Sequence, residues 1–235
     1  MEHKKNWSFS RSKAITFAAS EVIDNFGIWI GVMLESSFLF GLSIIPMYYF
    51  LFKNAPREQI NINSIQAIIS YIWEESLWKI NFPGFLISAL IAGIIISWLW
   101  MGMKRIALDI YNQKETGIDR LFIEPALAVN YCIASILFTV IVAIGTLCFI
   151  VPGIIAFVTF RFYGPAIVEH KYGPIEALLY SLKITSKKTM EVLLFVFLTV
   201  LITKVFGIFS FLGLPFILLT DIYLYKKLEE EYNKQ

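Results

Sequence analysis

The sequence predicts an all-α fold: a polytopic transmembrane helical bundle of about six spans, arranged as three hairpins with interfacial amphipathic helices. Composition is the first reason, since 57% of the 235 residues are hydrophobic and 16% are charged. Soluble domains are about half apolar and about a quarter charged. Six long apolar segments are the second reason, and the distribution of basic residues is the third. A soluble core of this size could not enclose so much apolar surface, whereas a bilayer accepts it on the outside as well.

Each apolar segment approaches the roughly 20 residues that a helix needs to cross a bilayer. The segments are 26–52, 83–103, 127–149, 151–168, 189–209 and 212–225. Around them we expect one integral membrane domain over 1–235, with a cytoplasmic amphipathic segment at 1–25, an outer loop at 53–82 and a cytoplasmic tail at 226–235.

Proline and glycine mark the expected turns. Pro152 and Gly153 follow the third segment directly. Proline is tolerated in the first turn of a helix, where its missing N–H has no partner to lose. We therefore expect a tight hairpin there, with Pro152 near the start of the fourth helix. Residues 213–215 are expected to form a similar tight turn between the fifth and sixth segments.

The basic residues predict the orientation of the chain. With the N-terminus inside, 15 of the 20 Lys and Arg residues fall in cytoplasmic segments and three fall outside. Cytoplasmic loops carry such an excess of basic residues. Joining the third and fourth segments into one span would remove this asymmetry. Both termini are therefore expected on the cytoplasmic side of the membrane.

Amphipathic segments are expected beside the spans. In the outer loop, apolar residues between Ile65 and Trp73 follow helical spacing. That helix is expected to lie on the outer leaflet or to cover the bundle. Segments 11–25, 117–124 and 174–188 each precede a predicted hairpin, which suggests a parallel repeat or a convergent pattern.

A basic cytoplasmic surface is predicted at Lys183, Lys187 and Lys188. These residues follow an amphipathic pattern formed by Leu178, Leu179, Leu182 and Ile184. Such a segment favours anionic lipid. Membrane lipids are therefore the expected partners, together with other membrane proteins or a second copy of the chain. The net charge of +2 is too small to indicate nucleic acid.

Part of the sequence resembles a known family. The residues that carry this resemblance are the run 102–108, the run 150–154, Arg161-Phe162, Glu169 and the run 173–181. They are similar to the YciC-like bacterial inner-membrane proteins, and to the membrane domain attached to some glycerophosphoryl diester phosphodiesterases. The resemblance covers about the last 130 residues. The chain lacks the soluble α/β pattern of about 250 residues that a phosphodiesterase barrel needs. The resemblance thus implies a membrane architecture and no reaction.

The glycines and prolines of these runs have local structural roles. Gly173 and Pro174 are expected to start a helix, because proline suits the first helical position. Gly164 and Pro165 follow Arg161 within the fourth segment. Pro165 cannot donate to the carbonyl four residues before it, so we expect a kink or break at this point.

Charged residues within spans are costly and are candidates for functional sites. Glu35, Arg161 and Asp221 are expected at similar depths, whereas Lys204 is close enough to a span end for its ammonium to reach the interface. An arginine between two carboxylates would satisfy its guanidinium group. This cluster is predicted to fasten helices together or, alternatively, to form a transport site beside a broken helix.

Catalytic motifs are absent from the sequence, and no cofactor or metal is expected. Cys132 and Cys148 lie within one apolar run, and His3 and His170 have no ligand spacing around them. We therefore expect a non-enzymatic membrane protein that organises or modulates the cytoplasmic membrane through lipid or protein partners. A small transporter or permeability factor is the alternative, and a membrane-embedded lipid enzyme is a third hypothesis.

Overall fold

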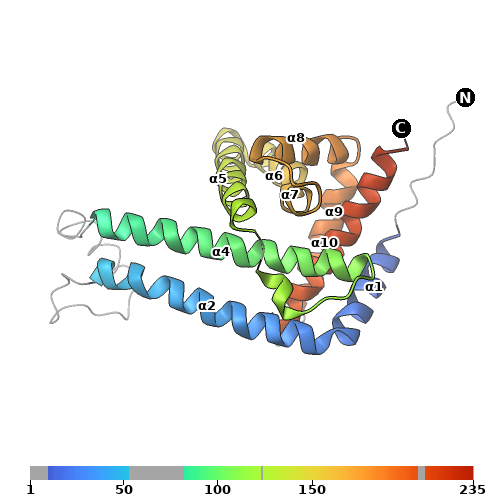
Figure 1. The fold of residues 1–235 in the computed structure, drawn as a ribbon. Helices are drawn as coiled ribbons and strands as arrows, with labels where there is room; N and C mark the ends of the chain where they lie inside the picture. Colours follow the sequence, from blue (N-terminus) through green and yellow to red (C-terminus); the bar gives the residue numbers. More distant parts are fainter. Residues whose placement is uncertain (1–9, 53–81, 123, 206–209, 235) are drawn as a thin grey trace, which may run out of the picture. The chain divides into compact units, whose positions relative to one another are not determined.

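The described part of the chain is helical, with no β-strand among its residues. A computed structural model describes residues 10–52, 82–122, 124–205 and 210–234 (Figure 1). Its α-helices are α1 (Arg11–Asp24), α2 (Phe26–Phe52), α4 (Phe82–Tyr111), α5 (Pro125–Cys148), α6 (Ile150–Phe160), α7 (Tyr163–His170), α8 (Pro174–Thr185), α9 (Thr189–Val205) and α10 (Ser210–Tyr232). A short 3₁₀ helix, η2, covers Ile118–Leu121. The predicted all-α class is confirmed.

Four helical segments in the described residues are long and apolar enough to cross a membrane. They are Phe26–Phe50, Pro83–Tyr111, Pro125–Cys148 and Ile150–His170. The apolar stretch Thr189–Ile202 of α9 is shorter. Their length and composition are those of an α-helical membrane protein.

Three features predicted from the sequence are compared here with the helices that the structure describes. The second apolar segment ends at residue 103, and α4 continues beyond it to Tyr111, so Lys104 and Arg105 are helical. Residues 213–215 were expected to form a turn, but they lie inside α10, where Pro215 occupies the second turn. The helix expected around Ile65 lies outside the described residues.

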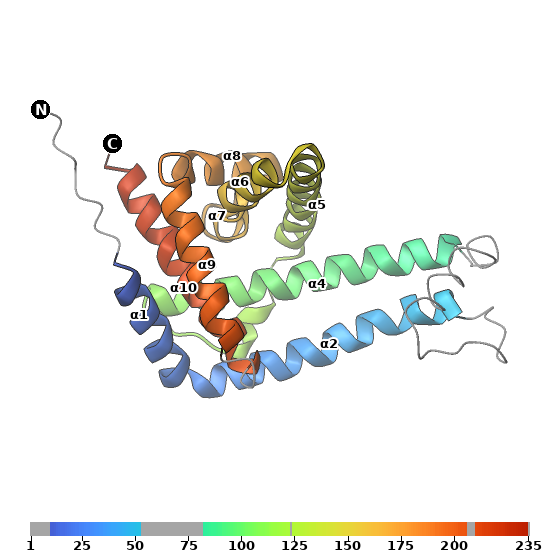
Figure 2. The same ribbon diagram turned by 180° about the vertical axis from the view of Figure 1, so that it is seen from behind.

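The chain divides into two compact units. One unit combines Met1–Met33 with Trp98–Gln235, and the other is Leu34–Ser97. In the first unit α1 and α9 both pack against α10, and Figure 2 shows these helices from the opposite side to Figure 1. The stripe Ala14, Ala18 and Val22 of α1 is buried there. Part of the predicted N-terminal amphipathic segment therefore covers protein.

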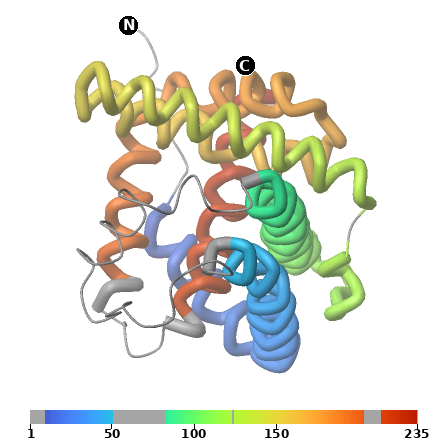
Figure 3. Tube along the Cα trace, turned by 90° about the vertical axis from the view of Figure 1, so that its left-hand side faces the viewer, coloured from blue at the N-terminus to red at the C-terminus, as the bar shows by residue number. Residues whose placement is uncertain are grey.

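A tight turn connects α5 to α6, as the chain trace in Figure 3 shows. Phe149 is extended between the two helices, and Pro152 lies in the first turn of α6. A Cβ atom built on Gly145 would lie 3.0 Å from the Cα of Gly153. A Cβ atom on Gly153 would lie 2.8 Å from the backbone nitrogen of Thr146. The two helices therefore approach so closely that both glycines are needed.

Candidate functional site

The fourth apolar segment is divided in two. α6 ends at Phe160, α7 begins at Tyr163, and Arg161 and Phe162 form the turn between them. Pro165 is the third residue of α7, a position where its missing N–H breaks no helical hydrogen bond. Gly164 and Pro165 are thus placed just after the break, which lets α7 start in a new direction.

Ser181 of α8 satisfies the backbone at this break. Its hydroxyl donates a hydrogen bond to the carbonyl of Thr159 at 2.7 Å. It also accepts one from the backbone N–H of Phe162 at 3.0 Å. Ser181 is fully buried, so water cannot replace it. α8 therefore holds the broken helix by polar contacts as well as by packing.

Arg161 and Asp221 form an ion pair that joins the break to α10. The two side chains are 14% and 19% exposed, and the guanidinium of Arg161 lies 5.8 Å from the ring centre of Phe157. One oxygen of Asp221, Oδ1, is buried without a protein hydrogen-bond partner. Glu35, the third predicted member, belongs to the other compact unit and is partly buried. The membership of Glu35 in this cluster therefore stays a prediction.

A further basic group lies within the second apolar helix. The Lys104 ammonium is 5.4 Å from the ring centre of Tyr131 and 5.5 Å from that of Tyr163, distances at which a cation is attracted to an aromatic face. A Cβ atom on Gly164 would lie 2.9 Å from the Tyr131 ring, so Gly164 leaves space for this arrangement. Sequence analysis counted Lys104 only among the cytoplasmic basic residues, because it directly follows the second apolar segment.

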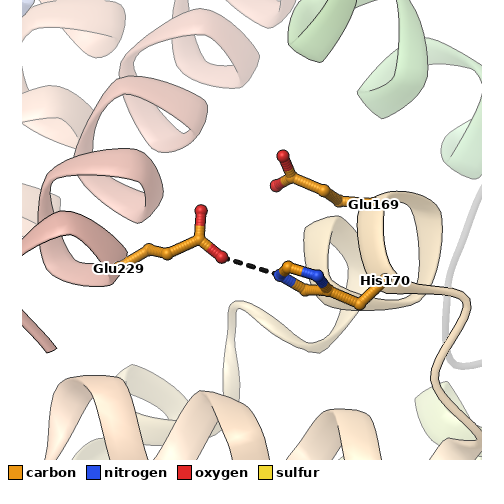
Figure 4. A group of neighbouring side chains, drawn as sticks. All are labelled: Glu169, His170 and Glu229. Carbon is orange, nitrogen blue, oxygen red and sulfur yellow. Dashed lines mark hydrogen bonds and ion pairs between the residues drawn. The ribbon is translucent and has the colours of Figure 1, made fainter. Parts of the chain in front are cut away.

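A cluster of polar side chains lies where α7 ends. His170 Nε2 is 2.7 Å from Glu229 Oε1, and the Tyr180 hydroxyl donates to the same oxygen at 2.7 Å. The Lys226 ammonium donates to Glu229 Oε2 at 2.8 Å and also to Glu169 Oε1. Figure 4 shows Glu169 and His170 of α7 facing Glu229 of α10. These contacts tie α7, α8 and α10 together.

The same cluster contains metal-ligand types. The ligand atoms of Glu169, His170 and Glu229 lie within 4.8 Å of one another. However, the Lys226 ammonium bonds both carboxylates, so a metal ion would have to displace it. Burial on its own raises the pKa of Glu229, but hydrogen bonds from Lys226, Tyr180 and His170 outweigh it and lower this pKa. The arrangement stabilises a charged carboxylate inside the protein.

α8 and the turn after it carry the predicted basic surface. Gly173 precedes the helix, Pro174 is its first residue, and the Gly173 N–H donates to Glu176 Oε2 at 3.3 Å. This hydrogen bond holds the carboxylate of Glu176 at the start of the helix, where the helix dipole favours a negative charge. Lys183 and Lys187 are exposed.

The apolar surface of α8 differs from the prediction. Leu178 and Ile184 are buried against the bundle and cannot face a membrane. Ile175 and Leu179 are exposed by 64% and 49%. They share one side of the helix because they are four residues apart. Lys188 lies 3.6 Å from Glu191 and 3.8 Å from Glu231, so it belongs to an ion-pair network on α9 and α10.

The structure brings together several residues that the sequence could not join. Glu169 and Lys226 are 57 positions apart, and His170 and Glu229 are 59 apart. The sequence does contain a signal for this cluster: Lys226 and Glu229 have the i, i+3 spacing of a helical ion pair, and Glu169-His170 follow the last apolar residues of α7.

The similarity to YciC-like proteins stays a prediction, since no protein-family model matches the chain and searches of curated proteins and solved structures found no match.

Proposed function

We propose that this chain is a non-enzymatic integral membrane protein that organises or modulates the bacterial cytoplasmic membrane by binding anionic lipid. The observation that supports this proposal is the outer surface of α8 and of the turn that follows it. Exposed Ile175, Leu179 and Lys183 lie on this short helix, and exposed Lys187 lies two residues past its end. Apolar side chains beside basic ones suit the boundary between acyl chains and anionic headgroups. Each basic residue near such a surface contributes about 1 kcal/mol.

The proposal includes six spans with both termini in the cytoplasm. In this topology α9 and α10 supply the last two spans, and α8 lies at the inner leaflet. Single cysteines introduced at Asn61 and at Gln113, after Cys132 and Cys148 are replaced by serine, should react with an impermeant maleimide from opposite sides of the membrane. Reaction of both from the same side would reject the topology.

The lipid preference is tested on the full-length protein in nanodiscs. We expect spin-labelled phosphatidylglycerol to be immobilised more than spin-labelled phosphatidylcholine, and this difference to shrink with added salt. The double variant Lys183→Gln/Lys187→Gln should reduce the preference. Lys227→Gln/Lys234→Gln removes the same charge from the C-terminal region and serves as the matched control. Equal immobilisation of both lipids by the unmodified protein would reject the proposal.

A small transporter is the second candidate. It is favoured by the Arg161–Asp221 ion pair beside the break between α6 and α7, because some transporters build binding sites from broken helices and buried charges. Under this hypothesis, proteoliposomes should show chloride or phosphate flux above that of protein-free vesicles. Arg161→Leu should abolish the flux while leaving the protein folded. Flux no greater than that of empty vesicles would remove anion transport from consideration.

A further inference from the structure

A polar pocket of about 200 Å³ lies in the first compact unit, where the C-terminal end of α4 meets the start of α5 and the end of α7. Apolar residues form part of its wall, and charged side chains form most of the rest. These charged residues are Arg105, Asp109, Lys114, Glu124, Glu169 and Lys171. Three are cationic and three are anionic, so the formal charge of the lining is zero.

Two carboxylate oxygens of this lining have no hydrogen-bond partner within the described protein, although the other oxygen of Glu169, Oε1, accepts from Lys226. Asp109 Oδ2 and Glu169 Oε2 are buried and accept no hydrogen bond from a protein group. Arg105 and Asp109 are four residues apart on α4, a spacing at which opposite charges usually pair, yet no ion pair joins them. Buried carboxylate oxygens without donors are uncommon and call for a ligand or ordered water.

The other charges of the lining are arranged differently. Lys171 lies 3.4 Å from Glu124, and both side chains are about two-thirds exposed, so this pair belongs to the open side of the pocket. Arg105, Asp109 and Glu169 are partly buried, and Lys114 is exposed. The pocket therefore offers buried acceptors for a cation and two basic side chains, Arg105 and Lys114, for an anion.

We propose that this pocket binds a zwitterion of the phosphoethanolamine type. Its ammonium would be held by Asp109 and Glu169, and its phosphate by Arg105 and Lys114. A ligand of one sign would meet as many like charges as opposite ones, because the lining is neutral overall. The volume equals that of about seven water molecules and is smaller than a site for a drug-sized ligand, so it suits a headgroup. This site is separate from the α8 surface and does not depend on the function proposed for that surface.

The same chemistry has two sources, a free phosphoethanolamine and the headgroup of phosphatidylethanolamine. For the free form, the thermal unfolding of full-length protein in detergent is followed with O-phosphoethanolamine, inorganic phosphate or ethanolamine. For the lipid, native mass spectrometry counts the phosphatidylethanolamine and phosphatidylcholine retained from mixed nanodiscs. Stabilisation by O-phosphoethanolamine above both fragments, or selective retention of phosphatidylethanolamine, supports the proposal and identifies the source. Equal effects of phosphate and O-phosphoethanolamine without lipid selectivity, or no effect in either arm, overturn it.

Matched variants assign the binding to this pocket. Asp109→Asn and Arg105→Gln should each weaken binding at least about tenfold, as expected for the loss of a charged hydrogen-bond partner. Asp119→Asn and Arg120→Gln alter exposed residues of the same connecting region that do not line the pocket, and should leave binding unchanged. Equal weakening by the pocket variants and their controls would overturn the assignment. The measurements on the unmodified protein stand even if a variant fails to fold.

Discussion

The Ser181 hydroxyl of α8 takes the place of a helical carbonyl for the backbone N–H of Phe162, which it binds at 3.0 Å. It simultaneously donates to the carbonyl of Thr159, on the other side of the break between α6 and α7. One buried side chain thus compensates both ends of an interrupted helix. A break in an apolar helix is tolerated where neighbouring groups satisfy its backbone.

Replacing Ser181 should therefore destabilise the protein. Ser181→Ala leaves a buried N–H and a buried carbonyl without their partner, and we expect a loss of about 1–3 kcal/mol in the free energy of unfolding. Ser186→Ala is the control, because Ser186 is exposed and its hydroxyl bonds only a nearby carbonyl of its own helix end. Unfolding in detergent with added denaturant measures both. Equal effects of the two substitutions would contradict the role given to Ser181.

Gly102 should not accept a side chain. A Cβ atom at this position would overlap the carbonyl group of Leu121, whose Cα would be 2.9 Å away. Because the obstacle is backbone, Gly102→Ala should cost about 1–3 kcal/mol of stability. Gly93→Ala lies on the same helix and meets no atom within 4 Å, so it should be neutral or stabilising. The two melting temperatures, compared with that of the parent protein, check the prediction.

The Arg161–Asp221 pair should behave as one unit. Asp221→Leu leaves a partly buried guanidinium without its carboxylate and should cost about 3–5 kcal/mol. The double variant Arg161→Leu/Asp221→Leu removes both charges and should be clearly more stable than the single one. A double-mutant cycle based on unfolding free energies measures the coupling. Additive effects of the two substitutions would show that the residues act independently.

Acid should weaken the cluster around Glu229. The pKa of this carboxyl group in the folded protein lies below the 4.5 of an unperturbed glutamate. Its contribution to stability is therefore fully present above about pH 4.5 and is lost as the pH falls through the folded pKa. Glu229→Gln should flatten the loss of stability in this acidic range.

The control for this pH dependence is Glu230→Gln. Glu230 is exposed and pairs with Lys227 at 2.8 Å on the surface, where an ion pair contributes little. Melting temperatures between pH 3 and pH 7 compare the variants, in a range chosen to bracket the ordinary pKa of glutamate. An unchanged pH profile in Glu229→Gln would show that other groups cause the acid sensitivity.

The sequence predicted the helical class and the position of the apolar segments, because hydrophobic length is a local property. It also marked 161–165 and 149–153 as irregular, since the conformational limits of proline and glycine are local as well. It ended the second apolar segment at residue 103 and did not show that the helix α4 continues to Tyr111. In that continuation, the Lys104 ammonium lies near one aromatic ring of α5 and one of α7. No local pattern contains that information.

The difference between local patterns and packing also explains which charged residues could be recognised from the sequence. It singled out Arg161 and Asp221 because a charge in an apolar run is visible without a fold. It gave no role in a site to Glu169, His170 or Lys226, because each stands at a segment end, where a charged side chain is ordinarily hydrated. Their meeting with Glu229 depends on how α7 and α10 pack. Likewise, Leu178 and Leu179 are adjacent leucines in the sequence, and only packing distinguishes the buried one from the exposed one.

The break after Phe160 also bears on the thickness of bilayer that this segment can fit. At 1.5 Å per residue, the 11 residues of α6 and the eight of α7 rise about 16 Å and about 12 Å. Neither helix alone spans a hydrocarbon layer of about 30 Å, so this segment can cross the membrane only with both helices. The angle between them, which Ser181 and the Arg161–Asp221 pair hold, therefore sets the depth that the segment covers. A straight helix of the same length can match a thinner hydrocarbon layer by tilting, whereas this segment matches it by its bend.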